Sequence, residues 1–130
     1  MIAEPSGDLR IMADTWDLEL PASAVLEEHH SSEHGPHGER DAVYVLSLDA
    51  SSAAGHWDPT DYTSSVSDVE PIIVRDIVES AAAPWTDAEL EDLRCRSPEA
   101  PGAVTPEGND HLAICLDPGD GTYVIFERIF

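Results

Sequence analysis

The chain of 130 residues contains no lysine, so its six basic residues are all arginines, set against 27 aspartates and glutamates. The formal net charge is −21 and the sequence pI is about 4.1. A protein that binds nucleic acid needs a basic surface to displace counterions from phosphate, so this composition excludes direct nucleic-acid binding. The same lack of basic residues argues against a surface that docks on anionic lipid.

Long hydrophobic runs and cysteines are also scarce. No stretch approaches the roughly 18 apolar residues that a membrane-spanning helix requires. The N-terminus lacks the basic and apolar segments of a signal peptide, which predicts a cytoplasmic protein. Cys95 and Cys115, the two cysteines, are too few for a disulfide scaffold. Because each lies among apolar residues, we expect two buried thiols, with a disulfide as the alternative.

The chain nevertheless contains enough apolar residues to fold. They make up 42% of the sequence, which is more than a compositionally disordered protein has. The length predicts a single compact acidic domain over residues 1–130. Segments 29–41, 49–67 and 97–110 are rich in residues typical of loops, and we expect them to be flexible.

Hydrophobic patterning predicts the elements of the first half of the chain. Apolar residues near alternate positions between Leu9 and Leu20 indicate a strand, or a bent pair of strands, that ends at Pro21. Residues 22–28 predict a short helix. The apolar, β-branched run 42–48 predicts a strand.

Two helices are expected in the second half. Apolar residues recur at helical spacing over 69–78, with a strand over 72–74 as the alternative. Thr86 followed three residues later by Glu89 forms a capping box, which predicts a helix over about 87–96.

The C-terminal end has the clearest hairpin pattern. Apolar strands over 111–116 and 122–128 flank a turn rich in Gly, Pro and Asp, which supplies the positive φ angles that a tight turn requires. Together the elements predict an α+β fold, with a small antiparallel sheet of about four strands, one or two packed helices and a C-terminal β-hairpin.

The histidine-rich segment 29–37 contains the sharpest local pattern. His30, Glu33 and His34 spell H-x-x-E-H, a motif in which two histidines one helical turn apart hold zinc beside a general base. Gly35 and Pro36 follow at once and break the helix that such a site needs. We therefore interpret the segment as a polar surface loop and keep His30 and His34 as weak metal-ligand candidates.

Other catalytic patterns are missing from the sequence. There is no glycine-rich loop followed by lysine for a nucleotide phosphate, and no G-x-S-x-G segment for a nucleophilic serine. Segment 117–121 has glycines where a calcium loop requires acidic residues at its third and fifth positions. We expect a non-catalytic protein without a cofactor.

Three explanations compete for the acidity. The carboxylates could imitate nucleic-acid phosphates and occupy a basic groove of another protein, as in a phage anti-CRISPR or anti-restriction protein of the mimic type. They could instead serve an immunity- or antitoxin-like inhibitor of a basic toxin enzyme. A third explanation is adaptation to a salty cytoplasm, which screens the repulsion between carboxylates. The first two share one mechanism, in which a small acidic domain blocks a basic functional surface, and this is the function we expect.

The expected partner is therefore a basic protein, such as a nucleic-acid-binding enzyme or complex. Stretches 11–39 and 41–74 contain no lysine or arginine, and if they adjoin in the fold, one face of the protein is strongly negative. The binding residues predicted from these stretches are Glu27, Glu28, Glu33, Asp58, Asp61, Asp68 and Glu70, with Trp57 as an apolar anchor. The alternative for Trp57 is burial against the edge of the core.

Overall fold

A computed structural model describes residues 7–16, 18, 20, 24–32, 40–48, 57, 59–65, 71–81, 83–96, 111–119 and 121–129. The strands are β1 (Val25–Ser31), β2 (Arg40–Ser47), β3 (Tyr62–Ser64), β4 (Arg94–Arg96), β5 (His111–Asp117) and β6 (Thr122–Ile129). The helices are α1 (Gly7–Thr15), the 3-10 helix η3 (Pro59–Asp61), α3 (Pro71–Ser80) and α4 (Asp87–Glu91).

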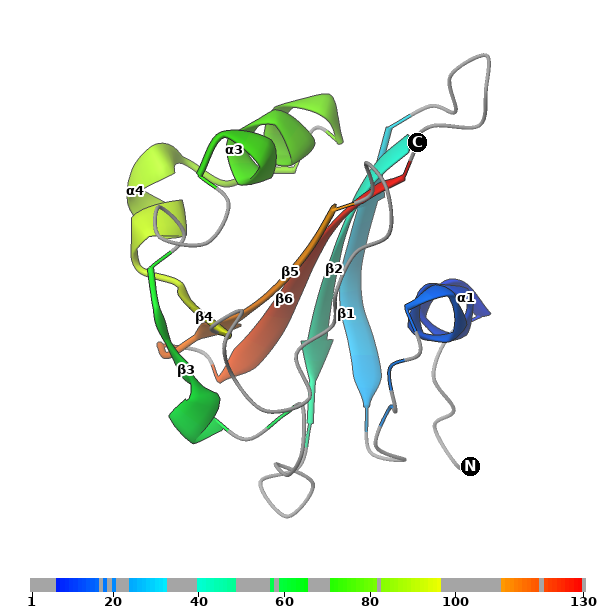
Figure 1. Cartoon of the computed structure of the whole chain (residues 1–130), viewed down its shortest axis with the longest axis horizontal. Coiled ribbons are helices and arrows are strands. Elements are labelled where there is room, and N and C mark those ends of the chain that lie inside the picture. Colours follow the sequence, from blue (N-terminus) through cyan, green and yellow to red (C-terminus); the bar gives the residue numbers. More distant parts are fainter. Residues whose placement is uncertain are drawn as a thin grey trace.

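All six strands join one antiparallel sheet in the order β1–β2–β6–β5–β4–β3 (Figure 1). The expected fold, a small sheet of about four strands with packed helices, is therefore wrong. The sheet is larger because β1, β3 and β4 form where the local patterns indicate a helix or a loop. Their pairing with distant strands decides their conformation.

Both faces of the sheet are buried, which explains the continuous apolar runs of β2 and β6. Successive side chains of a strand point to opposite faces. The α1-side cluster contains Met12, Ala13, Trp16, Leu18, Ala24, Ala42, Tyr44, Leu46, Trp57, Tyr62, Ile114, Tyr123 and Ile125. The α3-side cluster contains Val43, Val45, Val74, Ile77, Val78, Ala81, Leu90, Leu93, Cys95, Ala113, Cys115, Val124 and Phe126.

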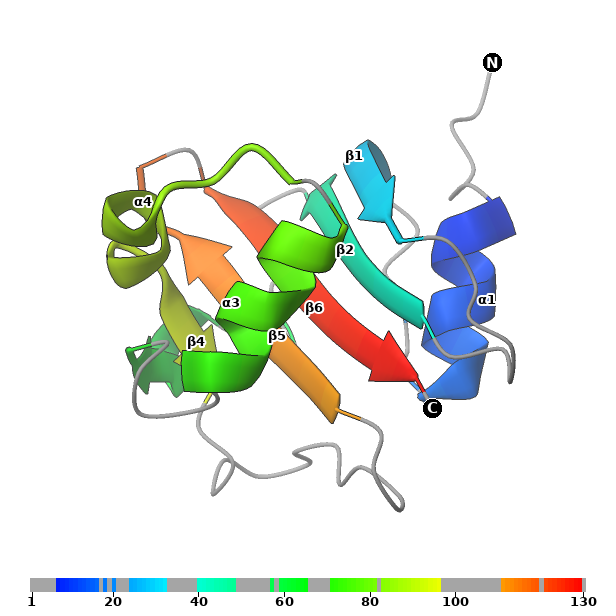
Figure 2. The same cartoon turned by 90° about the horizontal axis from the view of Figure 1, so that it is seen from above.

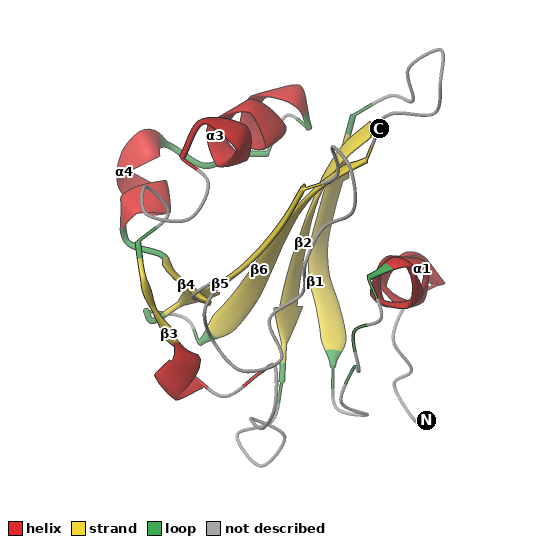
Figure 3. Cartoon of the chain, viewed as in Figure 1, coloured by secondary structure: helices red, strands yellow, loops and turns green. Residues whose placement is uncertain are grey.

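The helices cover the two faces unequally. Figures 1 and 3 show α1 on one side of the sheet and α3 with α4 on the other. From above, α3 lies across the middle of the sheet, where it packs mainly against β2 and β6 (Figure 2). A helix thus covers the centre of the sheet, and the two edges of the sheet are β1 and β3.

The two N-terminal elements are the reverse of those expected. Residues 9–15 of the predicted strand belong to α1, and residues 25–28 of the predicted helix belong to β1. Met12, Ala13 and Trp16 are buried at spacings that fit one face of a helix. The amide of Trp16 donates to the carbonyl oxygen of Met12 at 3.2 Å and continues that turn. Over so short a window the same apolar residues fit either period.

The two helices of the second half differ in how well they were predicted. α3 confirms the helix and excludes the alternative strand over 72–74. α4 begins at the predicted capping box, in which the Glu89 amide donates to the Thr86 hydroxyl at 3.2 Å. The helix ends at Glu91 rather than near residue 96, because residues 94–96 form strand β4, which pairs with β5 and β3.

The C-terminal hairpin is present as β5 and β6, which pair in register from His111 opposite Arg128 to Asp117 opposite Thr122. The turn depends on Gly121, whose φ of 71° is one that glycine adopts without steric cost. Its amide donates to the carbonyl oxygen of Asp117 at 2.8 Å and closes the turn.

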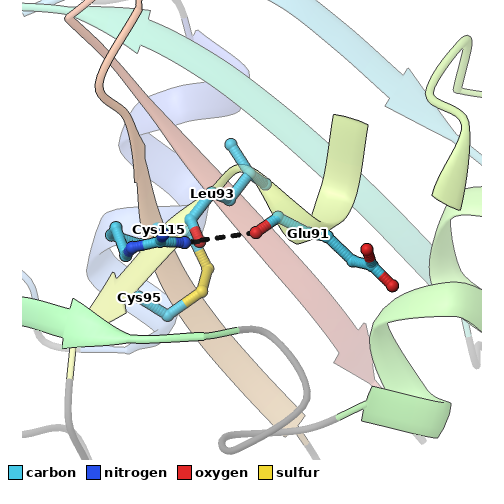
Figure 4. The surroundings of a disulfide bond; sticks show 5 residues. Glu91, Leu93, Cys95 and Cys115 are labelled. Carbon is cyan, nitrogen blue, oxygen red and sulfur yellow. Dashed lines mark hydrogen bonds between the residues drawn. A yellow bond between two sulfur atoms is a disulfide. The ribbon is translucent and has the colours of Figure 1, made fainter. Parts of the chain in front are cut away.

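A disulfide joins the two cysteines, so the expectation of two free thiols is wrong. Cys95 of β4 lies directly opposite Cys115 of β5, and both belong to the α3-side cluster. Figure 4 shows the bond close to Leu93, with the carboxylate of Glu91 pointing away from the sulfur atoms. The apolar surroundings were predicted, but the bond was not, because it depends on the pairing of β4 with β5.

Parts of the segments expected to be flexible belong to regular elements. His29–Ser31 lies in β1, residues 40–41 begin β2, and η3 and β3 lie within segment 49–67. Residues 33–39, 49–56, 58, 66–67 and 97–110 lie outside the described residues.

Candidate functional site

The structure separates the predicted binding residues that it describes. Glu27 and Glu28 are exposed on β1, whereas Asp61 ends η3 next to β3. β1 and β3 are opposite edges of the sheet, so Glu27 and Glu28 are separated from Asp61 by the strands between them. The other predicted acids, Glu33, Asp58, Asp68 and Glu70, lie outside the described residues.

Trp57 is buried, which corresponds to the alternative that the sequence left open. It is only 2% exposed and belongs to the α1-side cluster. Its ring meets that of Tyr123 edge to face, with centroids 5.4 Å apart, and the Tyr123 hydroxyl donates to the Trp57 carbonyl oxygen at 2.5 Å. Tyr62 contacts the same Tyr123 ring at 5.4 Å. Trp57 therefore cannot serve as an exposed anchor in this conformation.

The Tyr62 phenol is expected to make the stability of the fold depend on pH in the alkaline range. Burial raises the pKa of its phenol above the usual 10.0, Tyr123 adds to the rise, and Arg96 partly opposes it. A pKa raised by folding contributes stability that is complete below the unfolded-state pKa and is lost as pH rises above it. We expect the free energy of unfolding to fall above about pH 10, by up to about 1.4 kcal/mol per pH unit from this group.

Urea unfolding measured from about pH 9 to pH 11 tests this expectation. Tyr62→Phe should be less dependent on pH than the parent protein, because phenylalanine has no proton to lose. Parallel pH profiles for the two proteins would show that the Tyr62 phenol does not control the alkaline limit.

Arg128 of β6 forms an ion pair with Asp41 of β2. Its Nε and Nη2 atoms donate to the two carboxylate oxygens of Asp41 on β2, at 2.7 and 2.9 Å. This hydrogen bonding raises the pKa of Arg128. Asp76 of α3 lies 3.8 Å from the same guanidinium. The arginine therefore connects β2, β6 and α3.

Two further arginines are directed at acids within the fold. Arg40 Nη2 lies 3.5 Å from the buried Glu127, and Arg96, itself buried, lies 3.9 Å from Asp61. The remaining arginines, Arg10, Arg75 and Arg94, are exposed. Half of the basic residues thus lie close to acids, which partly offset their charge.

Among the residues that the structure describes, exposed acids occur on or next to α1, β1, α3 and α4. They are Asp14 on α1, Glu27 and Glu28 on β1, Asp76 and Glu79 on α3, and Glu89, Glu91 and Asp92 on or just after α4. α3 and α4 lie on the same side of the sheet (Figure 3), and α3 also carries the exposed Arg75. No binding residue was predicted on these two helices. The amphipathic pattern of α3 could have indicated one, because burying Val74, Ile77 and Val78 leaves the acids of α3 facing solvent.

Glu127 is a second feature that the sequence analysis missed. It is fully buried on β6, where Trp16 Nε1 donates to its carboxylate at 2.6 Å and the Tyr44 hydroxyl donates at 3.4 Å. The position of Glu127 in the strand could have indicated its burial. Residues 123, 125 and 127 face the same side of the sheet, so the Glu127 side chain lies on the α1 side with those of Tyr123 and Ile125.

The histidines of the H-x-x-E-H segment do not lie on a helix. His29 and His30 are consecutive residues of β1: His29 stacks on Tyr44 with centroids 4.5 Å apart, whereas His30 lies edge-on to Trp85. His30 Nε2 also lies 3.3 Å from the Glu28 carboxylate. Glu33 and His34 are outside the described residues. Among the residues that are described, no group of three potential ligands could hold a metal ion.

Comparisons with protein-family models, with curated proteins and with solved structures found no match. Within the described ranges, no helix is long and apolar enough to cross a membrane.

Proposed function

We propose that this chain is a non-catalytic acidic binding protein that inhibits a basic partner by occupying its functional surface. The partner class that best fits is a nucleic-acid-binding enzyme or complex, with the acidic domain acting as a nucleic-acid mimic of the anti-CRISPR or anti-restriction type. An immunity- or antitoxin-like inhibitor of a basic toxin enzyme is the related alternative. Both would use carboxylates to attract and block a positively charged surface.

The way the charges are distributed is the observation that supports this proposal. Arg40, Arg96 and Arg128 face acids within the fold, so few basic side chains offset the exposed carboxylates. A surface with a large charge of one sign produces a potential of several kT, which accelerates association with a partner of opposite charge. Two pairs of exposed acids are the clearest described candidates for contact with the partner. One pair is Glu91 and Asp92, just before β4, and the other is Glu27 and Glu28 on β1.

The spread of the exposed acids supports a different explanation. They occur on α1, β1, α3 and α4 rather than on one patch, as expected for adaptation of a whole surface to a salty cytoplasm. In that case the charge would be unrelated to binding. Circular dichroism melts at low salt and at about 2 M KCl separate the two, because the Debye length falls below about 3 Å at the higher salt. A cooperative melt at low salt supports the binding proposal, and folding only in molar salt supports adaptation.

Binding to a panel of basic nucleic-acid enzymes tests the proposal directly. At least one enzyme should bind with a dissociation constant below about 1 μM at 50 mM salt, and binding should weaken at least about 10-fold at 500 mM salt. Affinities that remain micromolar or weaker for every enzyme at low salt would contradict the proposal. Inhibition of the bound enzyme's nucleic-acid binding would then distinguish a mimic from a passive ligand.

Two variants with equal charge changes locate the contact surface. Glu91→Gln/Asp92→Asn removes two charges after α4, and Glu27→Gln/Glu28→Gln removes two from the β1 edge. A specific docking face predicts that one pair weakens binding much more than the other. Equal, small effects of both pairs would indicate attraction by the total charge alone.

A cytoplasmic location remains part of this proposal and is in tension with one feature of the fold. Disulfides persist in oxidising compartments and are rare in a reducing cytosol, yet Cys95 and Cys115 form one here. Trapping the thiols of cells that express the chain by alkylation would show which redox state occurs there.

A further inference from the structure

The Cys95–Cys115 disulfide lies where the sheet has the least other support. β4 is three residues long and pairs with β5 only through Arg94 opposite Leu116 and Cys95 opposite Cys115. β3, also three residues long, pairs with β4 across a register shift. By contrast, β2 and β6 are each eight residues long and lie under α3. The β3–β4 edge therefore has few hydrogen bonds of its own.

We propose that this disulfide is a redox lock on the β3–β4 edge, with the rest of the sheet able to stay folded when the bond is reduced. The noncovalent contacts of the edge include the 3.9 Å approach of Arg96 to Asp61 and the edge-to-face contact of Tyr62 with Tyr123. The inference does not depend on the proposed function.

Burial of the bond determines how reduction occurs. Cys95 and Cys115 are both 0% exposed, beneath the layer formed by α3 and α4. A dithiol reductant can attack a sulfur atom only after the edge opens. The attacking thiolate breaks the Cys95–Cys115 bond and forms a mixed disulfide, which the second thiol of the reductant resolves. Two electrons and two protons end on Cys95 and Cys115 as thiols, and the reductant becomes a cyclic disulfide.

Reduction removes a constraint on the open form of the edge. The bond closes a loop between cysteines separated by 20 residues. Without that closure the opened edge gains conformational freedom, which favours opening by about 100-fold for a loop of this size. Because α4 leads directly into β4, the exposed Glu91 and Asp92 border the released segment. The redox state would therefore also alter the acidic surface around α4.

Hydrogen exchange read by mass spectrometry tests the lock on the full-length protein. The samples are the oxidised chain, the same chain reduced with dithiothreitol, and Cys95→Ala/Cys115→Ala. Oxidised dithiothreitol is the matched control for the reductant. We expect exchange to accelerate by about 100-fold over residues 62–64 and 94–96 in the reduced chain, with protection retained over β2 and β6.

Two results would overturn the proposal. In the first, the edge peptides of the fully reduced chain exchange as slowly as those of the oxidised chain. In the second, protection is lost equally over β2 and β6, so that the bond supports the whole fold and not one edge. The double variant should reproduce the reduced pattern, and edge protection equal to that of the oxidised chain would also count against the lock.

Discussion

Trp57→Ala is expected to lower the free energy of unfolding by about 3–5 kcal/mol, the range for truncating a buried tryptophan. The indole is 2% exposed within the α1-side cluster and contacts Tyr123 edge to face. Its removal leaves a cavity beside two tyrosines that pack on one another. Since small domains have net stabilities of about 5–15 kcal/mol, a loss of this size would be evident in urea or thermal unfolding.

The same substitution separates the two interpretations of Trp57. If the side chain were an exposed anchor for a partner, its truncation would leave stability within about 0.5 kcal/mol of the parent protein and would weaken binding. Trp57→Phe is the matched control, because it keeps an aromatic ring against Tyr123 and should cost less than the alanine variant. An unchanged unfolding midpoint for Trp57→Ala would contradict the buried position.

Elements fixed by short-range interactions were predictable from the sequence. The Thr86–Glu89 capping box sets the start of α4 by contacts within four residues. The turn before Gly121 likewise depends on a local φ requirement. The helical spacing over α3 and the apolar run of β2 are equally local signals. The start of α4 and the bounds of α3 and β2 lie within a few residues of the predicted ones.

Elements that depend on distant partners were not predictable in this way. Residues 94–96 continue a helical pattern, but they become β4 because Cys95 pairs with Cys115. β1 forms against β2, in spite of a local pattern that indicates a helix. The hydrophobic periodicity of a short segment does not indicate which distant strand the segment will pair with. The number of strands was therefore underestimated.

The candidate site likewise combines features that the sequence determines with features that depend on the fold. The net charge of −21 is a property of composition and required no structure. The direction of each charged side chain depends on the sheet, which turns Arg40, Arg96 and Arg128 toward acids within the fold. A single negative face required the two base-free stretches to adjoin in the fold. In the structure Glu27 and Asp61 instead lie at opposite edges of six strands.

Glu127→Ala is expected to destabilise the protein by about 3–5 kcal/mol, because removing one partner of a buried charged network leaves the others uncompensated. The carboxylate is 0% exposed and accepts hydrogen bonds from Trp16 and Tyr44, with Arg40 3.5 Å away. The indole N–H of Trp16 would then lie in an apolar cluster without this acceptor. Urea unfolding measures the loss directly.

Glu127→Gln and Trp16→Phe distinguish the hydrogen bond from the charge. Glutamine keeps a carbonyl oxygen for the indole and should therefore cost less than alanine, whereas Trp16→Phe removes the donor and leaves the carboxylate in place. Since the two side chains touch at 2.6 Å, their effects should be non-additive, with a coupling of about 0.5–3 kcal/mol between Trp16→Phe and Glu127→Ala. Additive losses would mean that the bond does not hold α1 to the sheet. Strong coupling would mean that one buried carboxylate on β6 determines where α1 packs, since Trp16 directly follows α1 and lies 111 residues from its acceptor.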